Sequence, residues 1–307
     1  MAPATENEAA PFYASDRFPE AEVTEWQTHP RFPEAVRHAA MSGLRLYRGN
    51  RLLNTLVSDR GRSSIGLLAL YLHQQRQPDD PRSGLTLSRL KAICADQNIG
   101  SPGRVEAVVI LMRVFGLLHQ VRSADDRRVR QLVPTERLNA MLNDRWVSIF
   151  DAMALVMPEG ETFRTALADE AFERALVRRI SEDFLSGFRP MEDPGARELF
   201  GDRTAGLMVA FSLVTAGGPD EFPPREPVTV SISALARHFG VSRAHVRKLL
   251  RDAAVAGYIS QPSGETSKVV VLPPLKALVY NFFTNAFVVM RRCAREALEE
   301  AEAKRVM

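Results

Sequence analysis

The sequence predicts a mainly α-helical fold with small β-hairpins, an α+β class built from two related modules. Three observations lead to this prediction. Apolar residues recur at helical spacing over most of the chain from Pro33 onward. The stretch 228–271 gives signals for two short helices, a tight turn between them and then two short strands. The same order of signals occurs earlier in the chain, after a loop that ends at Gly84.

The stretch 228–271 has the element order of a winged helix-turn-helix. Ser231 and Ser242 are good N-cap residues, and each precedes a short helix. Gly240 ends the first helix and Gly257 the second, because glycine enters the left-handed region without a steric penalty. A turn at 262–265 and a β-branched run at 268–272 complete a hairpin. The second helix has apolar residues at core spacing, namely Val246, Leu249, Leu250 and Ala253.

With these apolar positions turned inward, the second helix presents a basic face. The helix carries no acidic side chain before Asp252. A helix-turn-helix places its second helix in the DNA major groove, where arginine can bond guanine and basic side chains neutralise phosphates. We therefore predict contacts to double-stranded DNA from Ser242, Arg243, Ala244, His245, Arg247, Lys248 and Arg251, and from Lys268 on the hairpin. The competing interpretation is a solvated face on a helix that only packs.

The earlier stretch repeats the pattern at a constant offset. Ser101 corresponds to Ser242 and Gly116 to Gly257, both 141 residues apart. The predicted DNA contacts of this first copy are Ser101, Arg104 and Arg113 on its second helix and Arg122, Arg127, Arg128 and Arg130 on its hairpin. We predict that the second copy reads bases while the first holds phosphates. The alternative is a first copy that has lost DNA contact and serves for dimerisation or protein binding.

Composition and charge divide the chain into three parts. Residues 1–30 hold six acidic residues and one basic residue, so they are predicted to be a mostly disordered acidic arm, with Phe12, Tyr13, Phe18 and Trp26 as candidates to dock part of it on the body. The formal net charge is +3 overall, which leaves +8 for the other residues and favours a polyanionic partner. Residues 31–157 are predicted to form the first module with its flanking helices. Residues 158–307 are predicted to form one long linking helix, the second module and a C-terminal helix that frays after Arg291.

The two modules, each flanked by helices, resemble bacterial transcriptional regulators of the MarR-like winged-helix superfamily over roughly 58–150 and 201–290. The resemblance implies a cytoplasmic regulator, associated with the nucleoid when bound, that dimerises through terminal helices to present two recognition helices. This chain carries two modules, so the resemblance also fits a fused pseudo-dimer. A monomeric pseudo-dimer and a homodimer both stay open.

Signals for other functions are missing. The six histidines have no metal-ligand spacing, and there is no phosphate-binding loop or nucleophile motif, so we expect no enzyme, cofactor or metal. No stretch is apolar and long enough to span a membrane. A small-molecule effector stays open, because Phe211, Phe282, Phe283 and Phe287 are candidates to line a pocket, although aromatics at this spacing are usually core. Two further alternatives are a replication initiator with tandem winged helices and a non-catalytic scaffold protein.

Overall fold

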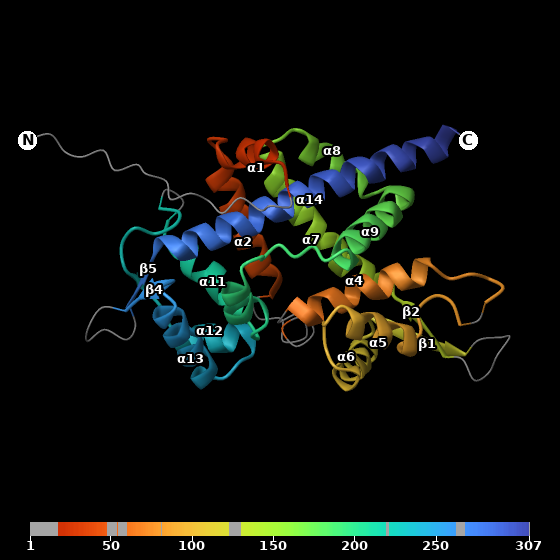
Figure 1. Ribbon diagram of the computed structural model, residues 1–307, viewed down its shortest axis with the longest axis horizontal. Coiled ribbons are helices and arrows are strands. Elements are labelled where there is room, and N and C mark those ends of the chain that lie inside the picture. Colours follow the sequence, from red (N-terminus) through yellow and green to blue (C-terminus); the bar gives the residue numbers. More distant parts are fainter. Residues whose placement is uncertain are drawn as a thin grey trace, which may run out of the picture.

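The computed structural model is mainly helical and contains two small antiparallel sheets. It describes residues 18–47, 54, 60–80, 82–122, 130–218, 221–261 and 268–306. The longest helix, α14 (Pro273–Val306), runs along one edge of the molecule, and two lobes lie beneath it in Figure 1. The other framework helices are α1 (Glu20–Gln27), α2 (Phe32–Tyr47), α7 (Glu136–Ala154), α8 (Glu159–Ala166) and α9 (Glu170–Leu185).

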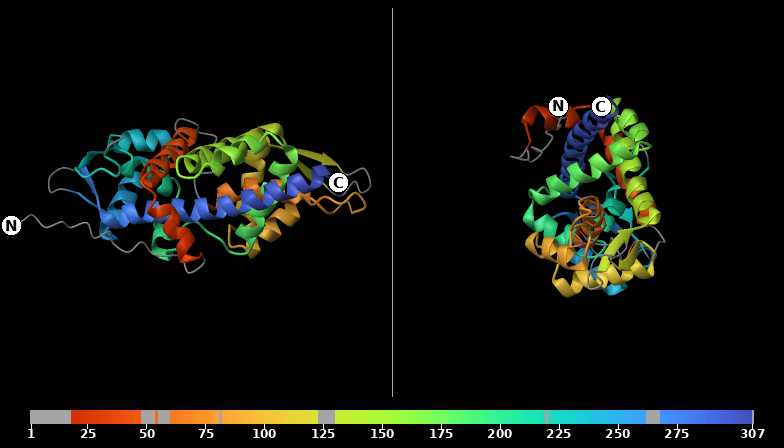
Figure 2. Two further views of the ribbon diagram at one scale, coloured as in Figure 1. Left: turned by 90° about the horizontal axis from the view of Figure 1, so that it is seen from above. Right: turned by 90° about the vertical axis from the view of Figure 1, so that its right-hand side faces the viewer.

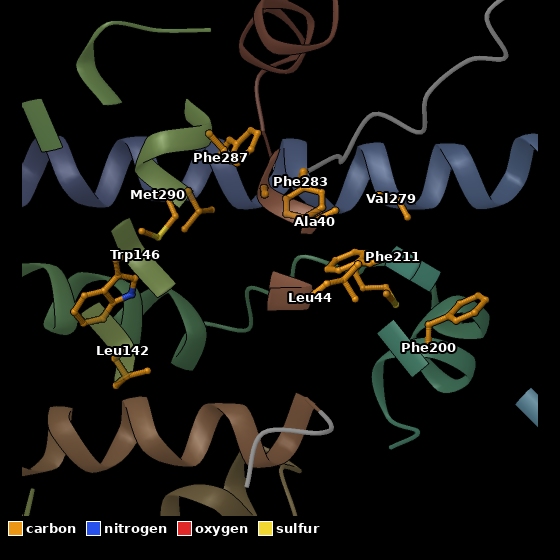
Figure 3. Close-up of a cluster of buried hydrophobic side chains, with 14 of the residues drawn as sticks. Ala40, Leu44, Leu142, Trp146, Phe200, Phe211, Val279, Phe283, Phe287 and Met290 are labelled. Carbon is orange, nitrogen blue, oxygen red and sulfur yellow. The ribbon is translucent and has the colours of Figure 1, made fainter. Parts of the chain in front are cut away.

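The middle of α14 is the centre of the core. Residues 287–290 of this helix are all buried, so this stretch is apolar and covered on every side rather than along one stripe. Phe287 is fully buried, and its ring centroid lies 5.2 Å from that of Trp26 on α1. Phe283 stacks on Phe211, with ring centroids 5.1 Å apart (Figure 3). The buried residues form one continuous cluster from Phe18 to Ala301.

The first lobe contains α4, two short helices and a hairpin. Its elements are α4 (Arg60–Gln74), α5 (Leu87–Asp96), α6 (Pro102–Val114), β1 (Leu118–Arg122) and β2 (Arg130–Pro134). β1 and β2 pair antiparallel, with Leu118 opposite Pro134 and Arg122 opposite Arg130. Gly116, at φ +67°, ends the turn after α6 and lets the chain enter β1 at once.

The second lobe follows the same order of two short helices and a hairpin. Its elements are α10 (Pro194–Ala196), the π-helix η1 (Arg197–Gly201), α11 (Gly206–Val214), β3 (Val228–Thr229), α12 (Ile232–Phe239), α13 (Arg243–Val255), β4 (Ile259–Ser260) and β5 (Lys268–Val271). The three strands form one sheet in the order β3-β5-β4. Gly257, at φ +76°, takes the position that Gly116 has in the first lobe.

Both lobes lie on the same side of the framework, which consists of α1, α2, α7, α8, α9 and α14. In Figure 1, α6 and α13 lie at the edge of the molecule opposite α14, and the end-on view in Figure 2 places the two lobes on that same side. The helices α2 and α7 lie between α14 and the lobes and pack against each other. The second helix of each lobe therefore faces away from the framework in a common direction.

Three expectations about the chain's ends and linker are corrected. The arm predicted to be mostly disordered over residues 1–30 is folded from Phe18 onward, where the candidate docking residue Trp26 is buried against α14; residues 1–17 lie outside the described residues. The single linking helix is two helices, α8 and α9, because Asp169 accepts a hydrogen bond from the Ala171 N–H (2.9 Å) and starts a new helix.

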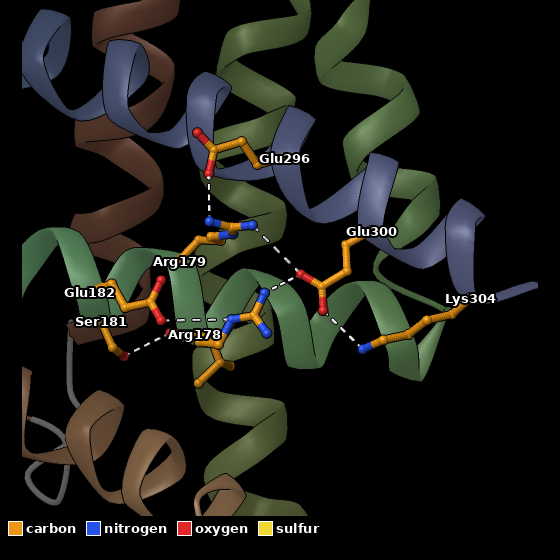
Figure 4. Close-up of polar contacts among 8 residues, drawn as sticks. Arg178, Arg179, Ser181, Glu182, Glu296, Glu300 and Lys304 are labelled. Carbon is orange, nitrogen blue, oxygen red and sulfur yellow. Dashed lines mark hydrogen bonds and ion pairs between the residues drawn. The ribbon is translucent and has the colours of Figure 1, made fainter.

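The third correction is that α14 does not fray after Arg291. Its charged last turns lie on α9 and form ion pairs with it (Figure 4). Arg179 pairs with Glu296 at 3.1 Å, and Arg178 pairs with Glu300. Glu300 also accepts a hydrogen bond from Lys304 at 2.9 Å. A network of this kind stabilises more than separate surface pairs, since Glu300 pairs with Arg178, Arg179 and Lys304 together.

Candidate nucleic-acid interface

The helix α13 is fixed in the second lobe by its ends and by one apolar face. The Ser242 hydroxyl oxygen accepts a hydrogen bond from the His245 N–H at 3.0 Å, which caps the N-terminus. Val246, Leu249 and Leu250 are at most 2% exposed. Burying side chains of this size stabilises a fold by about 1.5–3 kcal/mol each, so the rotation of α13 about its axis is well determined.

The opposite face of α13 is exposed and basic. Arg243, Arg247 and Arg251 recur at intervals of four residues and form one stripe along the helix. Lys248 lies beside this stripe, and its side chain is 62% exposed. Ser242 and Ala244, also predicted DNA contacts, are exposed at the N-terminal end of the same face. Asp252 is the only acidic residue of α13.

A third face of α13 is held by the loop before α11. Asp252 forms ion pairs with Arg203 of that loop and with Lys248, the latter at 2.7 Å. Hydrogen bonds from Lys248 and Arg203 lower the pKa of Asp252 to about 2. His245 lies two turns before Asp252 on the same side of the helix, and its Nε2 is 2.8 Å from the Thr204 carbonyl oxygen.

His245 contacts the backbone of its own chain, and its DNA contact stays a prediction. A carbonyl oxygen only accepts hydrogen bonds, so Nε2 of His245 is the donor and its imidazole is directed at the protein's own backbone. The ring is half-buried rather than facing outward with Arg243 and Arg247. The apolar residues at core spacing did not reveal this, because the loop that receives the ring lies 41 positions earlier in the chain.

Arg203 is the residue that sequence reasoning missed. Its guanidinium forms an ion pair with Asp252, the residue that also pairs with Lys248 of the basic face. The Arg203 side chain is 29% exposed. The sequence contains a signal for Arg203. The pair Asp202-Arg203 precedes one apolar stretch, and the similar pair Asp59-Arg60 precedes another apolar stretch. That repeat relates the two sequence positions but does not predict the ion pair.

The hairpins are described only in part. Lys268 is exposed at the start of β5, and the turn 262–267 lies outside the described residues. In the first lobe, Arg130 is exposed at the start of β2, opposite Arg122. The predicted contacts Arg127 and Arg128 lie outside the described residues.

The second helix of the first lobe does not repeat the basic face. Ser101 caps α6 by accepting a hydrogen bond from the Arg104 N–H (3.4 Å), and Ser101, Arg104 and Arg113 are all exposed, as predicted. The four positions that correspond to cations on α13 all differ, however, and Pro102 stands in place of Arg243. At the offset of 141, Arg247, Lys248 and Arg251 are replaced by Glu106, Ala107 and Ile110.

The aromatic residues proposed for an effector pocket pack against one another. Phe211, Phe282 and Phe283 form mutual ring contacts at 5.1–5.6 Å and belong to the core. A cavity of about 340 Å³ lies elsewhere, between α4, α7 and α9. Its lining includes His73, Asn139 and Glu173, so it is mainly polar.

The described residues contain no group of three or more histidine, cysteine or carboxylate side chains that could hold a metal ion. Within the same residues, no helix is long and apolar enough to cross a membrane. No family model matches the chain, and no curated protein or solved structure matches it either.

Proposed function

We propose that this protein is a sequence-specific DNA-binding transcriptional regulator in which α13 enters the major groove. The observation that carries the proposal is the outward face of α13, where Arg243, Arg247 and Arg251 are exposed in one stripe on a helix whose other faces are fixed. Arginine can bond guanine O6 and N7 bidentately, so such a stripe can read bases as well as neutralise phosphates.

The helix order of both lobes supports a tandem winged-helix arrangement. Each lobe has a serine-capped second helix, a glycine in the left-handed region after it and an antiparallel hairpin. The second helices of the two lobes face the same way, which favours a fused pseudo-dimer that meets one DNA duplex along its length. We place such a regulator in the cytoplasm, bound to the nucleoid.

The two lobes have different roles in this proposal. The second lobe reads bases through Arg247 and Arg251 and holds the backbone with Lys248 and Lys268. Arg203 adds a cation at the edge of the same face. The first lobe contributes phosphate contacts from Arg130 and its hairpin partner Arg122, because Glu106 and Ile110 make the face of α6 unsuited to a polyanion.

Arg247→Ala tests the proposal. A selection from genomic DNA fragments at near-physiological salt first defines the preferred site, and base-substituted versions of it are then titrated. We expect the variant to lose about 1–3 kcal/mol of binding free energy and to relax preference at one base pair. Arg305→Ala is the matched control, since it removes the same side chain from the last turns of α14, far from α13.

Equal losses on every DNA sequence would assign Arg247 to a phosphate instead of a base. No preferred fragment in the selection would refute sequence-specific reading altogether. In that case a scaffold function becomes the better proposal, and the apolar face of α6 is the observation that favours it.

A further inference from the structure

The outward face of α6 is apolar, which is unusual for the surface of this protein. Among the described residues, the exposed large hydrophobic side chains are Ile110 (51%), Val114 (71%), Val121 (42%) and Val255 (86%). Three of these four lie on α6 and the adjoining β1. Exposed apolar side chains that gather on one element mark a contact surface more often than scattered ones do.

The residues of this face follow the spacing of a coiled-coil seam. Gly103, Ala107, Ile110 and Val114 are separated by four, three and four residues, and all four are exposed. Apolar residues at this spacing form the stripe through which two helices pack. A Cβ atom at Gly103 would meet nothing within 4 Å, so the space over the first turn is open. Small residues at Gly103 and Ala107 let a second helix approach closely.

Charged residues beside the seam select the partner. Glu106 precedes Ala107 and Arg113 precedes Val114, so the two charges occupy the same flanking position two turns apart. When two copies of α6 pair antiparallel, Glu106 of each copy meets Arg113 of the other. One oxygen of Glu106 already binds Lys91 of its own chain at 2.5 Å, and the second oxygen can accept from the incoming guanidinium.

We propose that α6 is a self-association surface and that it pairs antiparallel with α6 of a second copy of this chain. The contact is isologous, so it closes at a dimer. Because α6 and α13 face the same way, this dimer and the approach of the first lobe to DNA are alternative states of the α6 face. The seam is specific to the first lobe, since the corresponding positions on α13 are Ala244, Lys248, Arg251 and Val255 and two of them are cations. The buried middle of α14 is already covered by its own chain, whereas the seam of α6 is exposed.

Charge-swapped variants of the full-length protein test this pairing by sedimentation equilibrium across the micromolar range. Ile110→Glu should abolish the dimer, because it places two carboxylates at the centre of the seam. Glu106→Arg and Arg113→Glu should each weaken dimerisation by about tenfold, since each sets like charges against one another across the contact. The double variant Glu106→Arg/Arg113→Glu should restore the wild-type constant.

Two controls make the outcome decisive. Val255→Glu changes the most exposed apolar residue of α13 and should leave the dimer intact. Far-ultraviolet circular dichroism and thermal unfolding check that each variant keeps its fold. A wild-type protein that stays monomeric over the whole range would overturn the proposal and assign the α6 face to a different protein. A double variant as weak as the single ones would overturn the antiparallel arrangement.

Discussion

Asp252 limits the affinity of the proposed DNA-binding face, and Asp252→Asn should therefore bind DNA more tightly. The carboxylate pairs with both Lys248 and Arg203 at the edge of that face. Its pKa is held at about 2 by hydrogen bonds from these two cations, so it is fully ionised at neutral pH and repels phosphate. The amide keeps the shape of the side chain and removes the negative charge.

The expected gain in DNA affinity follows from the change in net charge. The substitution adds one net positive charge to the face, and each further phosphate that is neutralised steepens the plot of log K against log salt by about 0.9. We expect a slope steeper by about 1 and an affinity about 3–10-fold higher at low salt. Fluorescence anisotropy with one fixed duplex, titrated at several salt concentrations, measures both. The gain should be the same at every pH from 6 to 8, because Asp252 stays ionised throughout this range.

Glu302→Gln is the control for net charge. Glu302 is exposed at the end of α14, far from α13, and its substitution removes one negative charge without touching the proposed interface. An unchanged slope for Asp252→Asn, or an equal change in both variants, would refute the assignment of DNA binding to α13. Weaker binding by Asp252→Asn would mean that Asp252 is needed to position Lys248 and Arg203.

Three further predictions concern stability. Phe287→Ala should lower the free energy of unfolding by about 3–5 kcal/mol in urea denaturation, because it leaves a cavity beside Trp26 and Phe283; a loss below about 1 kcal/mol would contradict the central position of α14. Gly257→Ala should cost about 1–2 kcal/mol, since φ is +76° there, and a neutral effect would contradict that geometry. Burial raises the pKa of Glu173 above its value in the unfolded chain, so the free energy of unfolding falls as pH rises from the unfolded pKa through the folded pKa. Glu173→Gln should therefore raise the melting temperature at pH 7 but not at pH 4. Equal shifts at both pH values would refute this.

The sequence was informative where local rules decide the structure. The inward face of α13 follows from the spacing of Val246, Leu249 and Leu250, so its outward basic face could be predicted without coordinates. The caps at Ser101 and Ser242 and the turn at Gly257 follow from side-chain chemistry and from glycine's access to positive φ. These features depend on residues within a few positions of one another.

The sequence was less informative where distant segments meet. The inward direction of His245 depends on Thr204, and the helical end of α14 depends on Arg178 and Arg179 of α9. The positive φ in the turn between α5 and α6 is at Asn98, at +52°. Asparagine enters this region more readily than other non-glycine residues, but the pattern of the sequence does not place it there.

Affinity cleavage of DNA from a single cysteine tests the central claim most directly. Both native cysteines, Cys94 and Cys293, are buried, so a cysteine introduced at the exposed Ala244 can be coupled selectively to an iron chelate. Bound to its selected site, the Ala244→Cys conjugate should cut the duplex within the protected bases, because the N-terminal end of α13 lies in the major groove. The same conjugate at Glu302→Cys, at the exposed end of α14, should cut little. Protection of the site without cleavage from Ala244→Cys would contradict the placement of α13 on DNA.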